Sequence, residues 1–292
     1  MIIATMSLEQ FQMAYSTEEA CIDYIFQSKW PDGFICPRCQ HRQAYVTNTR
    51  RLPLYECSHC RHQTSLTAGT LMEGSRTELH KWLLALFLIS RTDKSINAVE
   101  LSKLIQVTYK TAWLILHKIR LTIQKADQKT PLSGSIRINS AVYGRPFNPS
   151  THKHPKEHLL LVGSSLNERG ESTYLKLKFI TPNHPRERHI PRSELISFNN
   201  THIQSPSKHI ETVTGLYSPK RTRPLMTFAS KASSWLNETF HGIGAAHLQT
   251  YLAEFCYRFN LSIKNTPIFS HLSHLCFSNP TLNCSQAVQT AA

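Results

Sequence analysis

Four cysteines near the amino-terminal end have the spacing of a metal site. Cys36 and Cys39 form one Cys-x2-Cys pair, Cys57 and Cys60 form a second, and 17 residues separate the pairs. A two-residue gap lets each pair turn back so that both sulfurs face one ion, and four thiolates complete the tetrahedron that zinc prefers. We predict a structural zinc site with no open position for substrate. The alternative, four buried free thiols, does not require paired spacing.

The composition favours a polyanionic partner. The chain has 33 lysines and arginines against 19 acidic residues, which gives a net charge of +14. Nucleic acid is the first candidate for such a charge. No run reaches the roughly 18 consecutive apolar residues of a membrane-spanning helix, and the amino terminus lacks the pattern of a secretory signal. We expect a cytoplasmic protein without a membrane partner. In that reducing compartment the eight cysteines are not expected to form disulfides, so regular spacing among them indicates metal binding.

Hydrophobic periodicity predicts helices on both sides of the cysteines. A capping box at Ser16–Glu19 opens a short helix. After the cysteines, apolar residues at helical spacing predict helices over 78–90 and 96–104 and a third that begins at Thr108. The short break at 105–107 between the last two indicates a helix-turn-helix motif.

The leading end of the last helix in such a motif enters the major groove of duplex DNA. Hydrogen-bond donors and a stacking side chain gather there in this sequence. The residues that we predict to contact DNA are Lys103, Thr108, Tyr109, Lys110, Thr111 and Arg120. The alternative is an ordinary helical hairpin whose basic residues are only solvated.

The second half of the chain changes from helical to strand periodicity. Apolar residues over 136–142, 159–162 and 175–179 predict three successive strands, which implies an antiparallel meander. A strongly apolar helix face follows at 247–260. Residues 182–224 are proline-rich and weakly patterned, so they support no assignment.

Several motifs in this order resemble a known family. They are Trp30-Pro-Asp-Gly-Phe-Ile-Cys36-Pro-Arg-Cys39, Tyr55-Glu-Cys57-Ser-His-Cys60, Tyr109-Lys-Thr-Ala-Trp113, Trp235-Leu-Asn-Glu-Thr-Phe-His-Gly242 and His247-Leu-Gln-Thr-Tyr-Leu-Ala-Glu-Phe-Cys-Tyr-Arg-Phe-Asn260. Together they resemble bacterial insertion-sequence transposases that carry an amino-terminal zinc ribbon, a helix-turn-helix and a carboxy-terminal RNase H-like DDE domain. The resemblance extends from about Phe11 to Asn260.

The resemblance implies an α+β multidomain fold. The expected segments are an amino-terminal helical segment at 1–30, a zinc ribbon at 31–75, a helix-turn-helix domain at 76–127, a linker at 128–135, an RNase H-like α/β domain at 136–262 and a disordered tail at 263–292.

The catalytic residues of that family do not carry over to this chain. Such transposases cut and join DNA with two divalent cations, usually magnesium, held by carboxylates. The first aspartate position corresponds to Asn139, the second falls near Glu211 or Thr212, and the third maps close to Lys231. No aspartate follows Asp127. We therefore expect a degenerate transposase that cannot catalyse strand transfer, with zinc as its cofactor and magnesium only if the catalytic site survives.

The partners follow from the same resemblance. Double-stranded DNA, as transposon ends, is the expected ligand, with assembly as a homo-oligomer and association with the bacterial nucleoid. Basic residues of the second half are expected to form a DNA-facing surface, namely Lys176, Lys178, Arg186, Arg188, Arg192, Lys220, Arg221 and Arg223. Two alternatives stay open: an active DDE transposase with unusual metal ligands, and a zinc-ribbon protein whose basic surface serves RNA or protein contacts.

Overall fold

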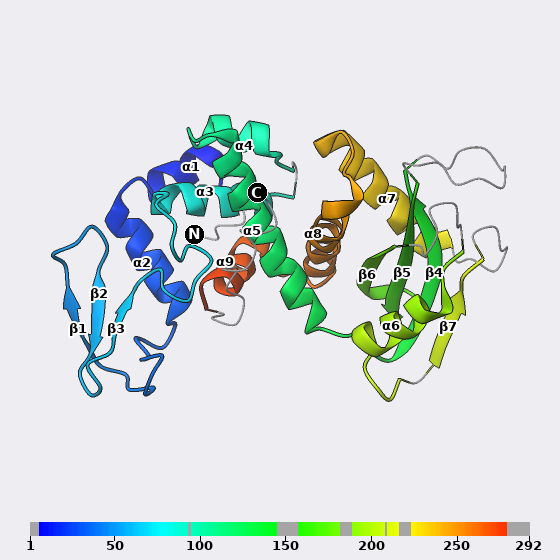
Figure 1. Cartoon of the computed structure of the whole chain (residues 1–292), viewed down its shortest axis with the longest axis horizontal. Helices are drawn as coiled ribbons and strands as arrows, with labels where there is room; N and C mark the ends of the chain where they lie inside the picture. Colours follow the sequence, from blue (N-terminus) through cyan, green and yellow to red (C-terminus); the bar gives the residue numbers. More distant parts are fainter. Residues whose placement is uncertain are drawn as a thin grey trace. The chain divides into compact units, whose positions relative to one another are not determined.

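The chain combines helices with two β-sheets, in agreement with the predicted α+β class. The computed structural model describes residues 6–92, 95–144, 157–181, 189–207, 209–215 and 223–278. Two compact units divide the chain, one formed by residues 1–122 with 267–292 and the other by residues 123–266 (Figure 1).

The first unit contains a small sheet and a group of helices. Its antiparallel strands have the order β1 (Ala44–Thr47), β2 (Leu54–Cys57) and β3 (Gln63–Ser65). Its helices are α1 (Leu8–Ala14), α2 (Glu18–Lys29), α3 (Leu79–Ser90), α4 (Ala98–Leu104), the amino-terminal part of α5 (Tyr109–Gln128) and α9 (Ile268–Ser278). The helices predicted over 78–90, over 96–104 and from Thr108 correspond to α3, α4 and α5.

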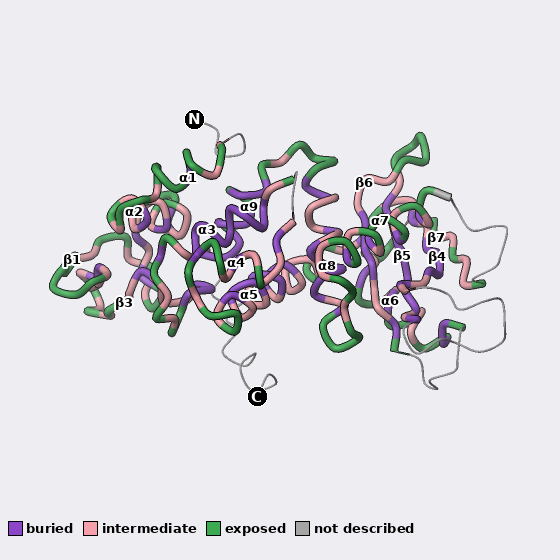
Figure 2. The backbone as a smooth tube through the Cα atoms, turned by 90° about the horizontal axis from the view of Figure 1, so that it is seen from above, coloured by how far each residue is buried: buried purple, intermediate pink, exposed green. Residues whose placement is uncertain are grey.

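Helix α3 forms the centre of the first unit. Ten of its twelve residues are buried, and it appears almost wholly buried in Figure 2. The ring of Phe11 in α1 stacks on Phe87 of α3 with centroids 4.2 Å apart and meets the edge of Phe269 in α9 at 5.3 Å. Offset and edge-on aromatic pairs of this kind stabilise a core beyond the apolar area that they bury.

The expected disordered tail instead begins with an ordered helix. In α9, Phe269, Leu272 and Cys276 are buried, and the amide of Leu71 donates to the carbonyl of Cys276 over 3.0 Å. The spacing of these apolar residues is helical, but the serine- and proline-rich composition around them concealed it. Residues 279–292 lie outside the described part of the chain.

The second unit has a four-stranded sheet with the order β6-β5-β4-β7. β4 (Ser135–Tyr143), β5 (His158–Leu166) and β6 (Ser172–Ile180) pair antiparallel in succession, so the predicted meander is confirmed. The chain then forms α6 (Arg192–His202) and returns as β7 (His209–Val213), which lies parallel to β4. α6 and β7 come from the segment that the sequence left unassigned.

Each face of this sheet is covered by helices. α7 (Arg223–Phe240) and α8 (Ala245–Ile263) supply Leu236 and Leu252 to one core, together with Leu160 of the sheet. On the other face, Phe198 of α6 packs with Leu132, which belongs to the segment predicted to be a linker. Leu132 is fully buried and exchanges backbone hydrogen bonds with His202 and Gln204. Most of that segment therefore belongs to the fold of the second unit.

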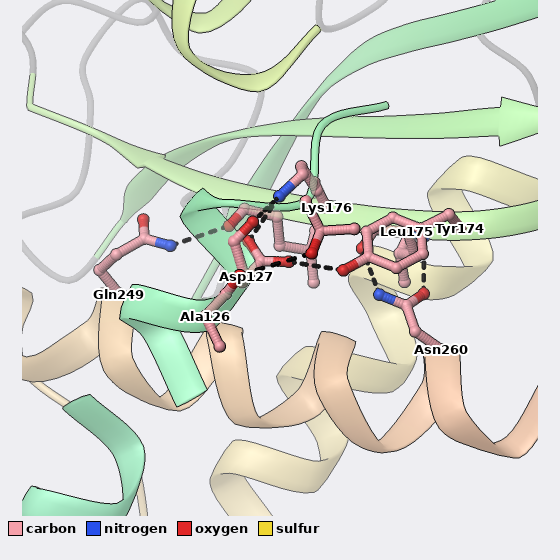
Figure 3. Close-up of polar contacts among 9 residues, drawn as sticks. Ala126, Asp127, Tyr174, Leu175, Lys176, Gln249 and Asn260 are labelled. Atoms are coloured by element: carbon pink, nitrogen blue, oxygen red, sulfur yellow. Dashed lines mark hydrogen bonds and ion pairs between the residues drawn. The ribbon is translucent and has the colours of Figure 1, made fainter. Parts of the chain in front are cut away.

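The open edge of β6 is closed by two amide side chains from α8 (Figure 3). Asn260 accepts a hydrogen bond from the amide of Leu175 at 2.7 Å and donates to its carbonyl at 3.0 Å. Gln249 accepts from the amide of Phe179 at 2.7 Å and donates to the carbonyl of Leu177 at 3.0 Å. These bonds satisfy backbone groups that an edge strand otherwise leaves open to another chain.

A buried ion pair connects the end of α5 to β6, also visible in Figure 3. Lys176 is 2% exposed, and its ammonium lies 2.8 Å from Asp127 Oδ2 and 2.6 Å from the Asp127 carbonyl oxygen. Tyr174 donates to the other carboxylate oxygen at 3.2 Å. The prediction that Lys176 faces DNA is therefore wrong. Alternation along β6 assigned its side chain to solvent, but Asp127 at the end of α5 covers it.

Candidate metal centre and nucleic-acid interface

The four predicted zinc ligands lie together in the first unit. The sulfurs of Cys36, Cys39, Cys57 and Cys60 all lie within 4.8 Å of one another. The Cys36–Cys60 and Cys39–Cys57 sulfur pairs are each 3.6 Å apart. A tetrahedral zinc–thiolate centre has sulfur–sulfur edges of about 3.8 Å, so the arrangement fits this ion. Zinc held by four thiolates would brace the ribbon and supply no open position for catalysis.

The two Cys-x2-Cys pairs adopt the same type of backbone turn. The amides of Cys36 and Cys57 donate to the carbonyls of His41 and His62, at 2.9 and 3.0 Å. The residue after each second cysteine has a positive φ, 61° at Gln40 and 58° at Arg61. The two loops share the pattern Cys-x2-Cys-x-His. They adopt one shape, which aims both sulfurs of each pair at a common point.

The pKa values of the clustered thiols also favour a bound cation. Burial disfavours the Cys36 thiolate, but backbone hydrogen bonds from Cys39 and Arg38 lower its pKa to about 7. The amide of His41 favours the Cys39 thiolate, yet burial and the neighbouring thiols raise the pKa of Cys39 to about 12. Four thiolates this close need a bound cation to ionise together.

An aromatic cluster joins α2 to the ribbon. The ring of Tyr55 in β2 lies 5.4 Å from Phe26, 5.2 Å from Trp30 and 5.8 Å from Phe34. The ammonium of Lys29 donates to three carbonyls of the segment after β3, those of Ser65, Leu66 and Ala68. Burial lowers the pKa of Lys29 to about 8. Helix α2 and the ribbon therefore form one packed module, although the sequence analysis separated them at residue 31.

Comparison with known proteins agrees with this module. Residues 16–63 match the transposase zinc-ribbon domain. The matched range includes α2, which the aromatic cluster attaches to the ribbon.

A second comparison covers more of the chain. An uncharacterized protein in transposable element ISH50 of Halobacterium salinarum is 24% identical over 166 residues, or 56% of this chain and 53% of that protein. The aligned part thus spans about half the length of the relative. No solved structure matches the chain. The chain is thus similar to a transposase zinc-ribbon domain in one segment and to a transposable-element protein over about half of its length.

The predicted DNA-contacting residues surround the start of α5. The Thr108 hydroxyl accepts from the amide of Thr111 at 3.2 Å, so it caps the helix as predicted. Tyr109 is 57% exposed, and Lys103 and Lys110 are exposed. The turn before the helix places Gln106 at a φ of 52°, a conformation usually taken by glycine.

Arg120 does not belong with this exposed group. It is 1% exposed, among the largest fully buried side chains of the described chain. Its position about three turns along α5, on the same stripe as the buried Leu116, explains the burial. An arginine buried in this way is not presented to DNA, so this contact prediction is wrong.

The positions that the transposase resemblance marked as catalytic lie in the second unit. Asn139 is fully buried in the middle of β4. On the adjacent strand its partner in the parallel register is Val213, whereas Glu211 pairs with Arg137. The guanidinium Nε of Arg137 lies 2.7 Å from Glu211 Oε2. The charge of Glu211 is therefore neutralised by Arg137, at a position on β7 two residues before the partner of Asn139.

Thr212 and Lys231, unlike Glu211, are turned away from Asn139. Thr212 is next to Val213 on β7, and alternation points its side chain to the opposite face of the sheet. Lys231 is exposed on α7, while the core stripe of that helix is formed by Leu225, Ala229, Ala232 and Leu236. No pair of carboxylates therefore converges on Asn139 from these positions, and a magnesium pair does not fit them.

The remaining basic residues of the proposed DNA-facing surface divide into two groups. Lys178 is partly exposed and Arg192 is exposed. Arg186, Arg188, Lys220 and Arg221 lie outside the described residues, as does the side chain of Arg223.

Within the described chain, no helix is both long enough and apolar enough to cross a membrane.

Proposed function

We propose that this chain is a zinc-stapled, DNA-binding protein of an insertion sequence, of transposase type, that binds duplex DNA without catalysing strand transfer. Helices α4 and α5 would act as the helix-turn-helix, and the second unit would be a degenerate RNase H-like domain.

The exposed start of α5 supports the DNA-binding part of this proposal. Tyr109 and Lys110 project from its first turn beside Thr108, and Lys103 lies in the last turn of α4. Four backbone amides at a helix start carry partial positive charge, which adds to the two lysines in attracting phosphate. No acidic residue occurs in the first turn of α5 to oppose them.

The strand order of the second unit supports the RNase H-like interpretation. Three successive antiparallel strands are followed by a helix and by a fourth strand that lies parallel to the first. That arrangement brings β4 and β7 side by side, so that residues on both strands could share a metal ion.

The observation that carries the proposed inactivity is the pairing of Asn139 with Val213. A two-metal mechanism needs anionic oxygens where charge develops on the attacking and leaving groups. Here the amide side chain of Asn139 lies beside the isopropyl group of Val213. The carboxylate of Glu211 on β7 is paired with Arg137. We derive no magnesium-dependent step for this chain.

The test uses the purified full chain, a duplex that contains the ends of the element, and magnesium or manganese. We expect the duplex to be bound and left intact. Nicking or joining that disappears in Glu211→Gln would contradict the proposal and favour an active enzyme with unusual ligands. A Lys110→Ala variant should weaken duplex binding with unchanged zinc content, and an unaffected affinity would remove α5 from the interface.

Reconstruction of the site gives a sharper test of the register. Asn139→Asp combined with Val213→Asp would place two carboxylates side by side on one face. We expect this variant to bind manganese in calorimetry, while the unmodified chain shows no manganese binding in the second unit. The matched control is Asn139→Asp with Thr212→Asp, whose new carboxylates point to opposite faces. Equal manganese affinity of the two variants would contradict the proposed geometry.

A further inference from the structure

The edge strand β1 of the zinc ribbon exposes large hydrophobic side chains to solvent. Three of the four residues of β1 are exposed, whereas β2 alternates between partly and fully buried residues. Tyr45 is 59% exposed and Val46 is 55% exposed. Among the large hydrophobic residues that the structure exposes in its described part, the two aromatic ones are Tyr45 and Tyr109. The ribbon thus repeats a feature of the start of α5.

Tyr45 belongs to a row of side chains that crosses all three strands. In register, Tyr45 pairs with Glu56, and Glu56 pairs with Gln63. This row lies on the face opposite to Tyr55, whose ring faces the aromatic cluster with Trp30. We call the row, together with Arg61, the outer ribbon face.

Arg61 is positioned over this row by both the metal site and the sheet. Its backbone completes the second Cys-x2-Cys turn with a φ of 58°. Its guanidinium carbon lies 5.7 Å from the centroid of the Tyr45 ring, and its Nη1 donates to Glu56 at 3.2 Å. Gln63 donates to the other oxygen of Glu56 at 2.9 Å. Hydrogen bonds from Gln63 and Arg61 keep the pKa of Glu56 below its usual range.

The exposed charge of the ribbon module is positive. Arg38, Arg42 and Arg50 are exposed on the same module. Between residues 31 and 65 the acidic residues are Asp32 and Glu56, and Arg61 neutralises Glu56. A flat aromatic ring, a guanidinium plane and further exposed arginines on the same module are the combination that binds a nucleic-acid strand through base stacking and phosphate contacts.

We propose that the outer ribbon face binds unpaired nucleotides of DNA, with a base stacked on Tyr45 and its phosphates held by the arginines. Paired bases inside a duplex already stack on one another, so a surface ring can reach a base only where the duplex is open or frayed. This inference rests on the proposed function in taking DNA as the ligand, but it assigns a different site and a different form of DNA.

The experiment compares binding of the full, zinc-loaded chain to a single-stranded oligonucleotide and to a duplex of equal length, by fluorescence anisotropy at one salt concentration. Tyr45→Ala should weaken single-strand binding about tenfold and change duplex affinity by less than about twofold, because stacking is available only to unpaired bases. Tyr45→Phe keeps the ring and should retain single-strand affinity. Tyr109→Ala should show the reverse pattern. Zinc content reports that each variant is folded.

Two results would overturn the proposal. One is an equal loss of affinity for both forms of DNA in Tyr45→Ala, which would make Tyr45 part of a general DNA surface. The other is single-strand affinity that is undetectable or unaffected by Tyr45→Ala. Failure of the proposed function has a different signature, since the unmodified chain would then not bind the duplex, whatever happens at Tyr45.

Discussion

The ribbon and the four-stranded sheet contain the two sets of positions that the sequence marked for metal, and the two sets differ in their ligand chemistry. In the ribbon, four sulfurs from two loops lie within 4.8 Å of one another. In the sheet, Asn139 faces Val213 and the carboxylate of Glu211 is paired with Arg137. The ribbon brings four sulfur donors together, whereas the sheet sets an amide beside an isopropyl group. We therefore expect the first set of positions to bind zinc and support folding, and we propose that the second set holds no pair of metal ions.

Removal of zinc should have the largest effect and should act first on the module that α2 forms with the ribbon. We expect Cys57→Ser to abolish zinc binding and unfold the ribbon, because a structural zinc site contributes on the order of 10 kcal/mol of folding free energy. Zinc content and limited proteolysis between residues 31 and 65 would measure this. Cys21→Ala, at a buried cysteine outside the four-sulfur cluster, should keep its zinc.

The sheet unit should instead depend on its buried ion pair. Lys176→Met leaves Asp127 without its ammonium partner in a buried position, and we expect a loss of about 3–5 kcal/mol in the free energy of unfolding. Urea denaturation of the zinc-loaded chain would measure the loss. Lys178→Met removes a partly exposed lysine of the same strand and serves as the control. A loss in Lys176→Met no larger than in this control would show that the pair is not needed.

A histidine should make the sheet unit sensitive to mild acid. Burial first, and then the charges of Lys176 and Lys178, lower the pKa of His202 to about 4. The unfolded chain, in which the histidine pKa is about 6.5, therefore binds more protons between these values. Stability is present above pH 6.5 and is lost as the pH falls toward 4. Denaturation midpoints of the unmodified chain and His202→Gln, compared across this range, should differ in slope, and parallel slopes would contradict the assignment.

The smallest effect is expected at the Arg137–Glu211 pair. Both side chains are partly exposed, so Glu211→Gln should change the free energy of unfolding by less than about 1 kcal/mol. The same variant should bind duplex DNA as the unmodified chain does, since Glu211 takes no part in the proposed interface. A large loss of stability would mean that Glu211 is more than a surface partner.

Sequence patterns predicted α2, α3, α4, α5 and α8, the antiparallel meander and the four zinc ligands because each rests on local spacing. They did not predict α1, α6, α7 or α9. The patterns failed where long-range packing decided the outcome. Lys176 alternates with Leu175 and Leu177 like a residue on a solvated face, but Asp127, 49 residues away in sequence, covers it. Arg120 has the basic side chain expected of a DNA contact, but it lies on the buried stripe of α5. Helix α9 joined a core whose other helices lie far earlier in the chain.

The sequence by itself determined the spacing of the cysteines, the apolar periods of the helices and strands, and the loss of aspartate after Asp127. These are properties of neighbouring residues, and a linear pattern records them fully. Only the tertiary structure decided that Val213 stands beside Asn139, that Glu211 is held by Arg137 and that Arg61 lies over Tyr45. The register of paired strands and the reach of long side chains set these neighbours, and both arise only when distant segments pack together.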